Sequence, residues 1–136
     1  MPSLEFGDTF YIGSNGGSTK VFQTTVLNNE LYAFTDNQGI KKASLSNPNL
    51  VDYNQWQVFD AGYWLGGTTF NGVITAVNAN DKLYKFNGST PIEIATLQDP
   101  LKDLRAYGNH LIVTTTNHVY VFNDAFQQVA HINSNQ

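Results

Sequence analysis

The chain contains no cysteine, which excludes a disulfide scaffold and a thiol nucleophile. Charged residues are scarce as well, at 13% of the 136 residues against the ~25% usual for soluble domains. No stretch approaches the ~20 consecutive apolar residues that a membrane-spanning helix needs, so no membrane partner is expected. Met1-Pro2-Ser3-Leu4-Glu5 lacks the basic flank and apolar core of a secretory signal, and we therefore expect synthesis in the cytoplasm.

Positive charge is especially scarce. Seven Lys and Arg residues against eleven Asp and Glu residues give a net charge of −4, and Arg105 is the single arginine. Contacts between basic side chains and phosphates supply most of the affinity of nucleic-acid-binding proteins. An acidic chain without a basic cluster is therefore not expected to bind nucleic acid.

Aromatic residues, asparagine, threonine and glycine are abundant. Phe, Tyr and Trp make up 13% of the chain, which also holds 16 Asn, 13 Thr and 11 Gly. Aromatic and β-branched residues favour strands, whereas Asn and Gly favour tight turns. Helical periodicity is nearly absent, and the aromatic content together with the low net charge excludes disorder. These features predict an all-β protein.

Short apolar runs bounded by Gly, Asn, Asp or Ser mark the expected strands. Thirteen are predicted: Thr9–Ile12, Lys20–Leu27, Glu30–Thr35, Ile40–Leu45, Trp56–Phe59, Gly67–Phe70, Val73–Val77, Lys82–Phe86, Ile92–Leu97, Leu104–Tyr107, His110–Thr115, Val119–Phe122 and Gln127–Ile132.

The strands repeat along the chain. Segments that begin at Asn29, Asn71 and Asn109 share an apolar strand, a polar turn and a second strand, at spacings of 42 and 38 residues. Four strands per roughly 40 residues is the period of a β-propeller blade. We expect a single repeat domain of about three blades, at approximately 20–60, 61–98 and 99–132, with a spare strand at 9–12. The alignment also predicts six residues at matching positions on one face of each second strand: Leu31, Ala33, Val73, Thr75, Leu111 and Val113.

Several segments resemble known propellers. Four segments resemble blades of tachylectin-type lectins: Leu31-Tyr32-Ala33-Phe34, Ile40-Lys41-Lys42-Ala43, the segment 52–56 and Asp81-Lys82-Leu83-Tyr84-Lys85. The wealth of Asn, Thr and Gly is similar to that of propeller segments in bacteriophage tail proteins. The resemblance implies a β-propeller fold with either glycan binding or a structural role in a virion. The Gly-His and Trp-Asp pairs of WD40 blades are missing, and so is the Asp-box of sialidases.

Three blades are fewer than the four to eight that close a propeller ring. The first and last blades are then expected to leave apolar faces open, which soluble monomers rarely tolerate. The expected partner is therefore a second copy of the chain, as a homodimer or a closed ring, unless a longer parent chain supplies the missing blades. The spare strand at 9–12 is expected to cross to a neighbouring copy.

Catalytic groups are few. No Gly-x-Ser-x-Gly elbow is present, and His110 and His118 are expected at opposite ends of one hairpin, which does not suit a shared metal site. His131 has no carboxylate beside it in the sequence. Most acids, including Asp36 and Asp81, sit in turn contexts, and no phosphate-binding loop is present. We therefore expect no enzyme activity, no cofactor and no metal. A propeller hydrolase ranks third among the functions considered, after a structural or interaction module and a glycan-binding lectin.

Aromatic residues between the first two units are the remaining candidates for a binding site. Sugars stack on such rings, and a neighbouring amide binds their hydroxyl groups. The predicted ligand-binding residues are Tyr53, Asn54, Trp56, Tyr63 and Trp64. The alternative interpretation is that the two Trp rings fill core space, as large aromatic residues often do. The leading expectation is a non-catalytic structural or interaction module, such as a virion component that binds other structural proteins, and the alternative is a glycan-binding lectin.

Overall fold

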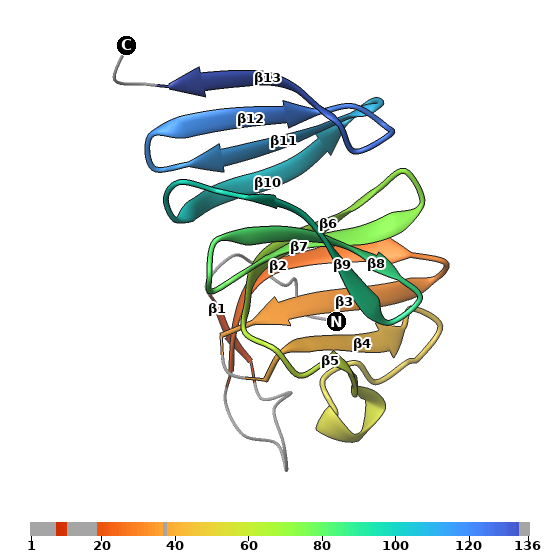
Figure 1. The fold of residues 1–136 in the computed structure, drawn as a ribbon. Coiled ribbons are helices and arrows are strands. Elements are labelled where there is room, and N and C mark those ends of the chain that lie inside the picture. Colours follow the sequence, from red (N-terminus) through yellow and green to blue (C-terminus); the bar gives the residue numbers. More distant parts are fainter. Residues whose placement is uncertain (1–7, 11–18, 37, 134–136) are drawn as a thin grey trace. The chain divides into compact units, whose positions relative to one another are not determined.

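The computed structural model describes residues 8–10, 19–36 and 38–133, and it is all-β (Figure 1). Within these residues the strands form three antiparallel sheets. The first sheet contains β1 (Asp8–Phe10), β2 (Thr19–Leu27), β3 (Glu30–Thr35), β4 (Ile40–Ser44) and β5 (Gln57–Asp60). The second contains β6 (Trp64–Phe70), β7 (Val73–Asn78), β8 (Lys82–Asn87) and β9 (Thr90–Thr96). The third contains β10 (Leu101–Tyr107), β11 (His110–Thr115), β12 (His118–Phe122) and β13 (Gln128–Asn133).

Each sheet is a meander, because its strands are hydrogen-bonded in the order in which they follow one another along the chain. Contacts divide the chain into two compact units, residues 1–65 and 66–136. The first unit holds the first sheet, and the second unit holds almost all of the second sheet and the whole third sheet. No helix among the described residues is long and apolar enough to cross a membrane.

The N-terminal strand differs from its prediction. Instead of being left spare, β1 pairs with β2 of the same chain, with Asp8 opposite Val21 and Phe10 opposite Thr19. Its described residues therefore add a fifth strand at the edge of the first sheet, and crossing to a neighbouring copy stays a prediction. Residues 11 and 12 of the predicted strand lie outside the described residues.

The turn before β7 corrects the predicted alignment of the second sheet by one residue. Asn28 and Asn29 both have positive φ, at 51° and 62°, and the equivalent pair in the second sheet is Asn71 at 51° and Gly72 at 76°. Asn71 therefore matches Asn28 and not Asn29. Consequently, the residues that match Leu31 and Ala33 are Ile74 and Ala76, both buried, and the predicted matches Val73 and Thr75 are wrong by one position. Asn is tolerated at either positive-φ position of such a turn, so the residue type could not fix the register.

The second and third sheets bury a joint core within the second unit. Phe70, Val77, Leu83 and Leu97 of the second sheet and its exit pack with residues of the third sheet, in one buried cluster. The contributions of the third sheet are Leu104, Leu111, Val113, Tyr120 and Phe122. The register explains this set, because Leu104, Val113 and Tyr120 lie opposite one another on adjacent strands, as do Leu111 and Phe122.

The first sheet has a core of its own. Val21, Leu31, Ala33 and Ala43 line one face of it and are all buried, and we call this surface the capped face. Leu50 and Trp56, from the connection between β4 and β5, pack against these residues. The capped face is thus covered by a loop of the same unit.

Candidate functional site

The five predicted ligand-binding residues lie in the first unit, in two settings. Tyr53 and Asn54 belong to the short 3-10 helix η2 (Tyr53–Gln55). Asp52 precedes this helix and accepts hydrogen bonds from the backbone N–H and the side-chain amide of Asn54, at 3.0 and 3.1 Å. This side-chain cap holds the helical turn, and the chain enters Trp56 immediately after it.

Trp56 is buried and its ring is fully engaged within the unit. Its Nε1 donates a hydrogen bond of 2.6 Å to the carbonyl oxygen of Leu50, and its side chain belongs to the cluster on the capped face. A tryptophan used in this way contributes packing and closes the connection between β4 and β5.

Tyr63 and Trp64 form the second setting. Tyr63 is 53% exposed, whereas Trp64 is buried and is the first residue of β6 rather than part of the predicted loop. Asp60 Oδ1 accepts hydrogen bonds from Trp64 Nε1 at 2.8 Å and from the backbone N–H of Gly62 at 2.7 Å. Both indole N–H groups of the protein therefore have internal acceptors, which leaves Tyr53, Asn54 and Tyr63 to offer polar groups to a ligand. Glycan binding by the five residues stays a prediction.

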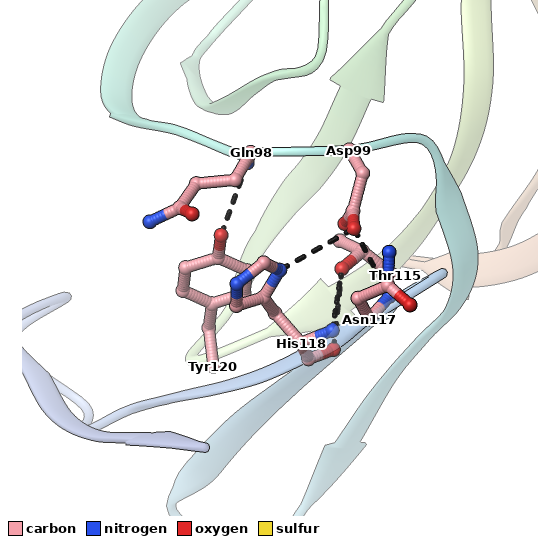
Figure 2. Close-up of polar contacts among 6 residues, drawn as sticks. All are labelled: Gln98, Asp99, Thr115, Asn117, His118 and Tyr120. Atoms are coloured by element: carbon pink, nitrogen blue, oxygen red, sulfur yellow. Dashed lines mark hydrogen bonds and ion pairs between the residues drawn. The ribbon is translucent and has the colours of Figure 1, made fainter. Parts of the chain in front are cut away.

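A second group of polar side chains, in the second unit, was not predicted from the sequence (Figure 2). Asp99 lies in the connection from β9 to β10, and His118 begins β12. Asp99 Oδ2 accepts a hydrogen bond from the backbone N–H of Asn117 at 3.0 Å and lies 3.3 Å from His118 Nδ1. Asp99 Oδ1 and His118 Nδ1 are buried without hydrogen-bond geometry to any described group.

Hydrogen bonds from the turn itself surround this pair. The Thr115 hydroxyl donates to the carbonyl oxygen of His118 at 3.2 Å and accepts from its backbone N–H at 3.1 Å. Gln98 donates its backbone N–H to the Tyr120 hydroxyl at 3.0 Å, as Figure 2 shows. The Thr115 hydroxyl, the His118 ring and Asn117 together lower the pKa of Asp99, against the opposing effect of burial. These contacts fasten the connection between the second and third sheets to the β11–β12 turn.

The rings of His118, Tyr120 and His131 lie against one another in the third sheet. The centroids of Tyr120 and His131 are 4.6 Å apart with the ring planes 9° from parallel, and those of His118 and His131 are 5.0 Å apart. Tyr120 and His131 are direct partners across β12 and β13, which explains the contact. His110 lies at the far end of the β11–β12 hairpin from His118. Among the residues that the structure describes, no three His, Cys, Asp or Glu side chains gather in a way that would hold a metal ion.

Sequence reasoning missed this group because its members are far apart in the chain. Asp99 directly precedes Pro100, which by sequence indicates only a turn, and the side-by-side placement of Tyr120 and His131 depends on the β12–β13 register. A usable signal was present in the alternation of His118, Tyr120 and Phe122, which places these three side chains on one face of a strand.

Comparison with known proteins shows the fold. No family model matches the chain, and no curated protein matches it. Among solved structures, PorZ, a surface component of the type-IX secretion system of Porphyromonas gingivalis, aligns with 97% of the chain at a TM-score of 0.65 and 16% identity. BamB from Moraxella catarrhalis aligns with 85% at a TM-score of 0.59 and 14% identity. The computationally designed protein Ika4 aligns with 82% at a TM-score of 0.57 and 9% identity.

These similar proteins are β-propellers, and the three sheets of this chain resemble propeller blades. The chain spans 20% of the PorZ chain and 35% of the BamB chain, and 71% of the Ika4 chain. The predicted blade repeat is confirmed, and the described strands resemble part of a propeller. Since identities are low, the similarity shows the fold and not the function.

Proposed function

We propose that this chain is a non-catalytic interaction module, and that it associates with a second copy through the outer face of its third sheet. We call that surface the open face. It consists of two rows of side chains that are direct cross-strand neighbours. The first row is Arg105, Ile112, Val121 and Ala130, and the second is Asp103, Thr114, Val119 and Ile132.

The observation that carries the proposal is the apolar character of this face. Ile112, Val119 and Val121 are only partly buried, and Ile132 is 58% exposed. On β10, β11 and β12, the opposite face is buried against the second sheet. A half-solvated antiparallel sheet normally has polar residues on its outer side, so apolar residues there favour a surface that is covered in the functional state.

The charged residues of the open face favour a second copy as the partner. Arg105 Nε and Asp103 Oδ2 lie at the β10 end of the two rows, and they form an exposed ion pair of 2.7 Å. In a two-fold arrangement, the Arg105 of each copy faces the Asp103 of the other, so that the surface complements itself. A two-fold pair is preferred to a closed ring, because a ring also needs an available face on the first sheet, and the capped face is already covered by Leu50 and Trp56.

The remaining observations agree with a role without catalysis. Asp99 and His118, the most enclosed acid–base pair described above, are engaged with the β11–β12 turn. The similarity in composition to phage tail propellers makes a virion component the setting that we propose for this module.

Light scattering across a dilution series tests the proposal. We expect the mass of a dimer for the parent chain, and a monomer for Ile112→Asp, because two carboxylates at the centre of a two-fold interface repel each other and lose water. Val129→Asp is the matched control, since Val129 is also exposed, at 54%, but lies outside the two rows. A parent chain that stays monomeric at all concentrations would overturn the proposal, and so would equal effects of the two substitutions.

A further inference from the structure

A cavity of about 350 Å³ lies in the second unit, where a loop of the third sheet reaches the second sheet. Its apolar walls are Val73, Ile92 and Phe126, and its polar lining includes Lys85, Asn71 and Asn87. The volume is at the lower end of the range for small-molecule sites. The cavity shares no residue with the open face, so it is independent of the proposed function.

One wall is built by a strained residue. Phe126 has φ of 61°, a left-handed conformation that bulky side chains rarely adopt. Asn123 holds this loop, because its side-chain oxygen accepts from the backbone N–H groups of Ala125 and Gln127, at 2.9 and 3.0 Å. The Phe126 ring then meets Phe70 of the second sheet edge to face, with centroids 5.4 Å apart. A residue kept in a costly conformation is a recognised feature of binding sites.

The second sheet contributes its own tie to the same loop. Asn71, in the β6–β7 turn, donates a hydrogen bond of 2.9 Å from its side-chain amide to the carbonyl oxygen of Asp124. The cavity is therefore bounded by groups that are held in place from both sheets. Pre-formed walls of this kind lower the entropic cost of binding a ligand.

Lys85 gives the cavity its charge. Its ammonium group lies 4.7 Å from the centroid of the Phe126 ring, and within the described part of the chain no carboxylate forms an ion pair with it. Lys82, three residues earlier on the same strand, differs in that its ammonium group pairs with Glu93 at 3.1 Å. The cavity thus offers a cation without a carboxylate partner, next to exposed amides and an apolar surface.

We propose that this cavity binds a small organic acid, in which a carboxylate is attached to an aromatic or aliphatic body. The carboxylate accepts hydrogen bonds from Lys85 and from the amide of Asn87, and the body packs on Val73, Ile92 and Phe126. The charge-assisted bond selects an acid over a neutral molecule of the same shape. Ile92, which is 40% exposed, becomes covered when the ligand is bound.

The test is an NMR titration of the ¹⁵N-labelled chain with 4-phenylbutyrate and, separately, with its neutral isostere 4-phenylbutanamide. We expect the acid to shift the backbone amide signals of Val73, Asn87 and Gly88 in a saturable way, with a Kd of about 1 mM, as ligand efficiency suggests for a probe of this size. The neutral amide is expected to bind about fivefold to tenfold more weakly, because it lacks the charge-assisted hydrogen bond. N-acetylneuraminate, a carboxylate on a polar body, is expected to bind more weakly than phenylbutyrate.

Two variants isolate the cation. Lys85→Gln is expected to remove the preference for the acid over the amide, and Lys82→Gln is expected to keep it. Absence of saturable shifts, equal affinity for the two phenyl probes, or an unchanged preference in Lys85→Gln would each overturn the proposal. Tighter binding of N-acetylneuraminate than of phenylbutyrate would overturn the assignment of an apolar body.

Discussion

The first and third sheets are built from the same repeat, yet their apolar faces are covered in different ways. In the first sheet, Leu50 and Trp56 reach back over Leu31 and Ala33. In the third sheet, the residues that match these two, Leu111 and Val113, are buried against the second sheet. The other side of the third sheet is the open face, where Ile132 remains largely exposed.

The difference shows two ways in which the apolar face of a repeat is covered. A repeat unit cannot bury both of its faces alone, so a face that no neighbouring unit covers needs another solution. In the first sheet, the long β4–β5 connection supplies that solution from within the unit. The β12–β13 connection of the third sheet is short, and its Phe126 packs against the core shared with the second sheet. Loop length and one tryptophan therefore distinguish a capped repeat from an open one.

The largest expected effect comes from a substitution on the buried side of the third sheet. Leu111 is fully buried between the second and third sheets, and Leu111→Asp places an unpaired carboxylate there. We expect the free energy of unfolding to fall by about 5 kcal/mol or more, comparable with the whole stability of a small domain. Thermal unfolding by circular dichroism measures the change.

The adjacent residue provides the control for that experiment. Ile112 lies on the open face, so Ile112→Asp is expected to cost the isolated chain only about 1 kcal/mol. If the two variants unfolded at the same temperature, the assignment of the two faces would be wrong.

A smaller effect is expected at the capped face. Trp56→Ala removes a buried ring together with its hydrogen bond to the carbonyl oxygen of Leu50, and we expect a loss of about 3 kcal/mol in urea unfolding. Trp56→Phe keeps most of the packing and loses the N–H donor, so about 1 kcal/mol is expected from the hydrogen bond. Equal stability of Trp56→Ala and the parent chain would contradict the role of Trp56 as a cap.

Much of the fold could be predicted from the sequence because the signals for strands and turns are local. Glu30–Thr35 and His110–Thr115 begin and end where the sequence predicted them. The sequence did not predict Trp64 as a strand residue because Gly66 and Gly67 follow it. A glycine can indicate a turn, but it also occurs within strands where another backbone approaches closely.

The sites were harder to predict because they depend on distant contacts. The sequence left Trp56 with two interpretations, ligand binding or core packing, and its burial depends on where the β4–β5 connection turns back. The pairing of Tyr120 with His131 depends on a strand register that includes a bulge between Val121 and Phe122. Sequence periodicity carries neither piece of information.

The smallest expected effect concerns a cation on the capped face. Lys41 lies directly opposite Ala33 and is only 5% exposed, and burial lowers the pKa of its ammonium group below the ordinary value of about 10.4. The folded chain then binds the Lys41 proton less tightly than the unfolded chain, so the stability of the parent rises as the pH increases from the folded pKa toward the unfolded one. Lys41→Met removes this penalty and is expected to raise the free energy of unfolding by about 1 kcal/mol at pH 7.

The pH dependence separates this explanation from a general gain in packing. Above pH 10.4 or so, the lysine is neutral in both states, and the advantage of Lys41→Met should largely disappear. Urea unfolding at a series of pH values between about 7 and 11 measures it, with Lys102→Met, at an exposed position of β10, as the control for a lysine-to-methionine change at the surface. A constant advantage across that range would mean that the methionine stabilises the capped face through its hydrocarbon chain alone.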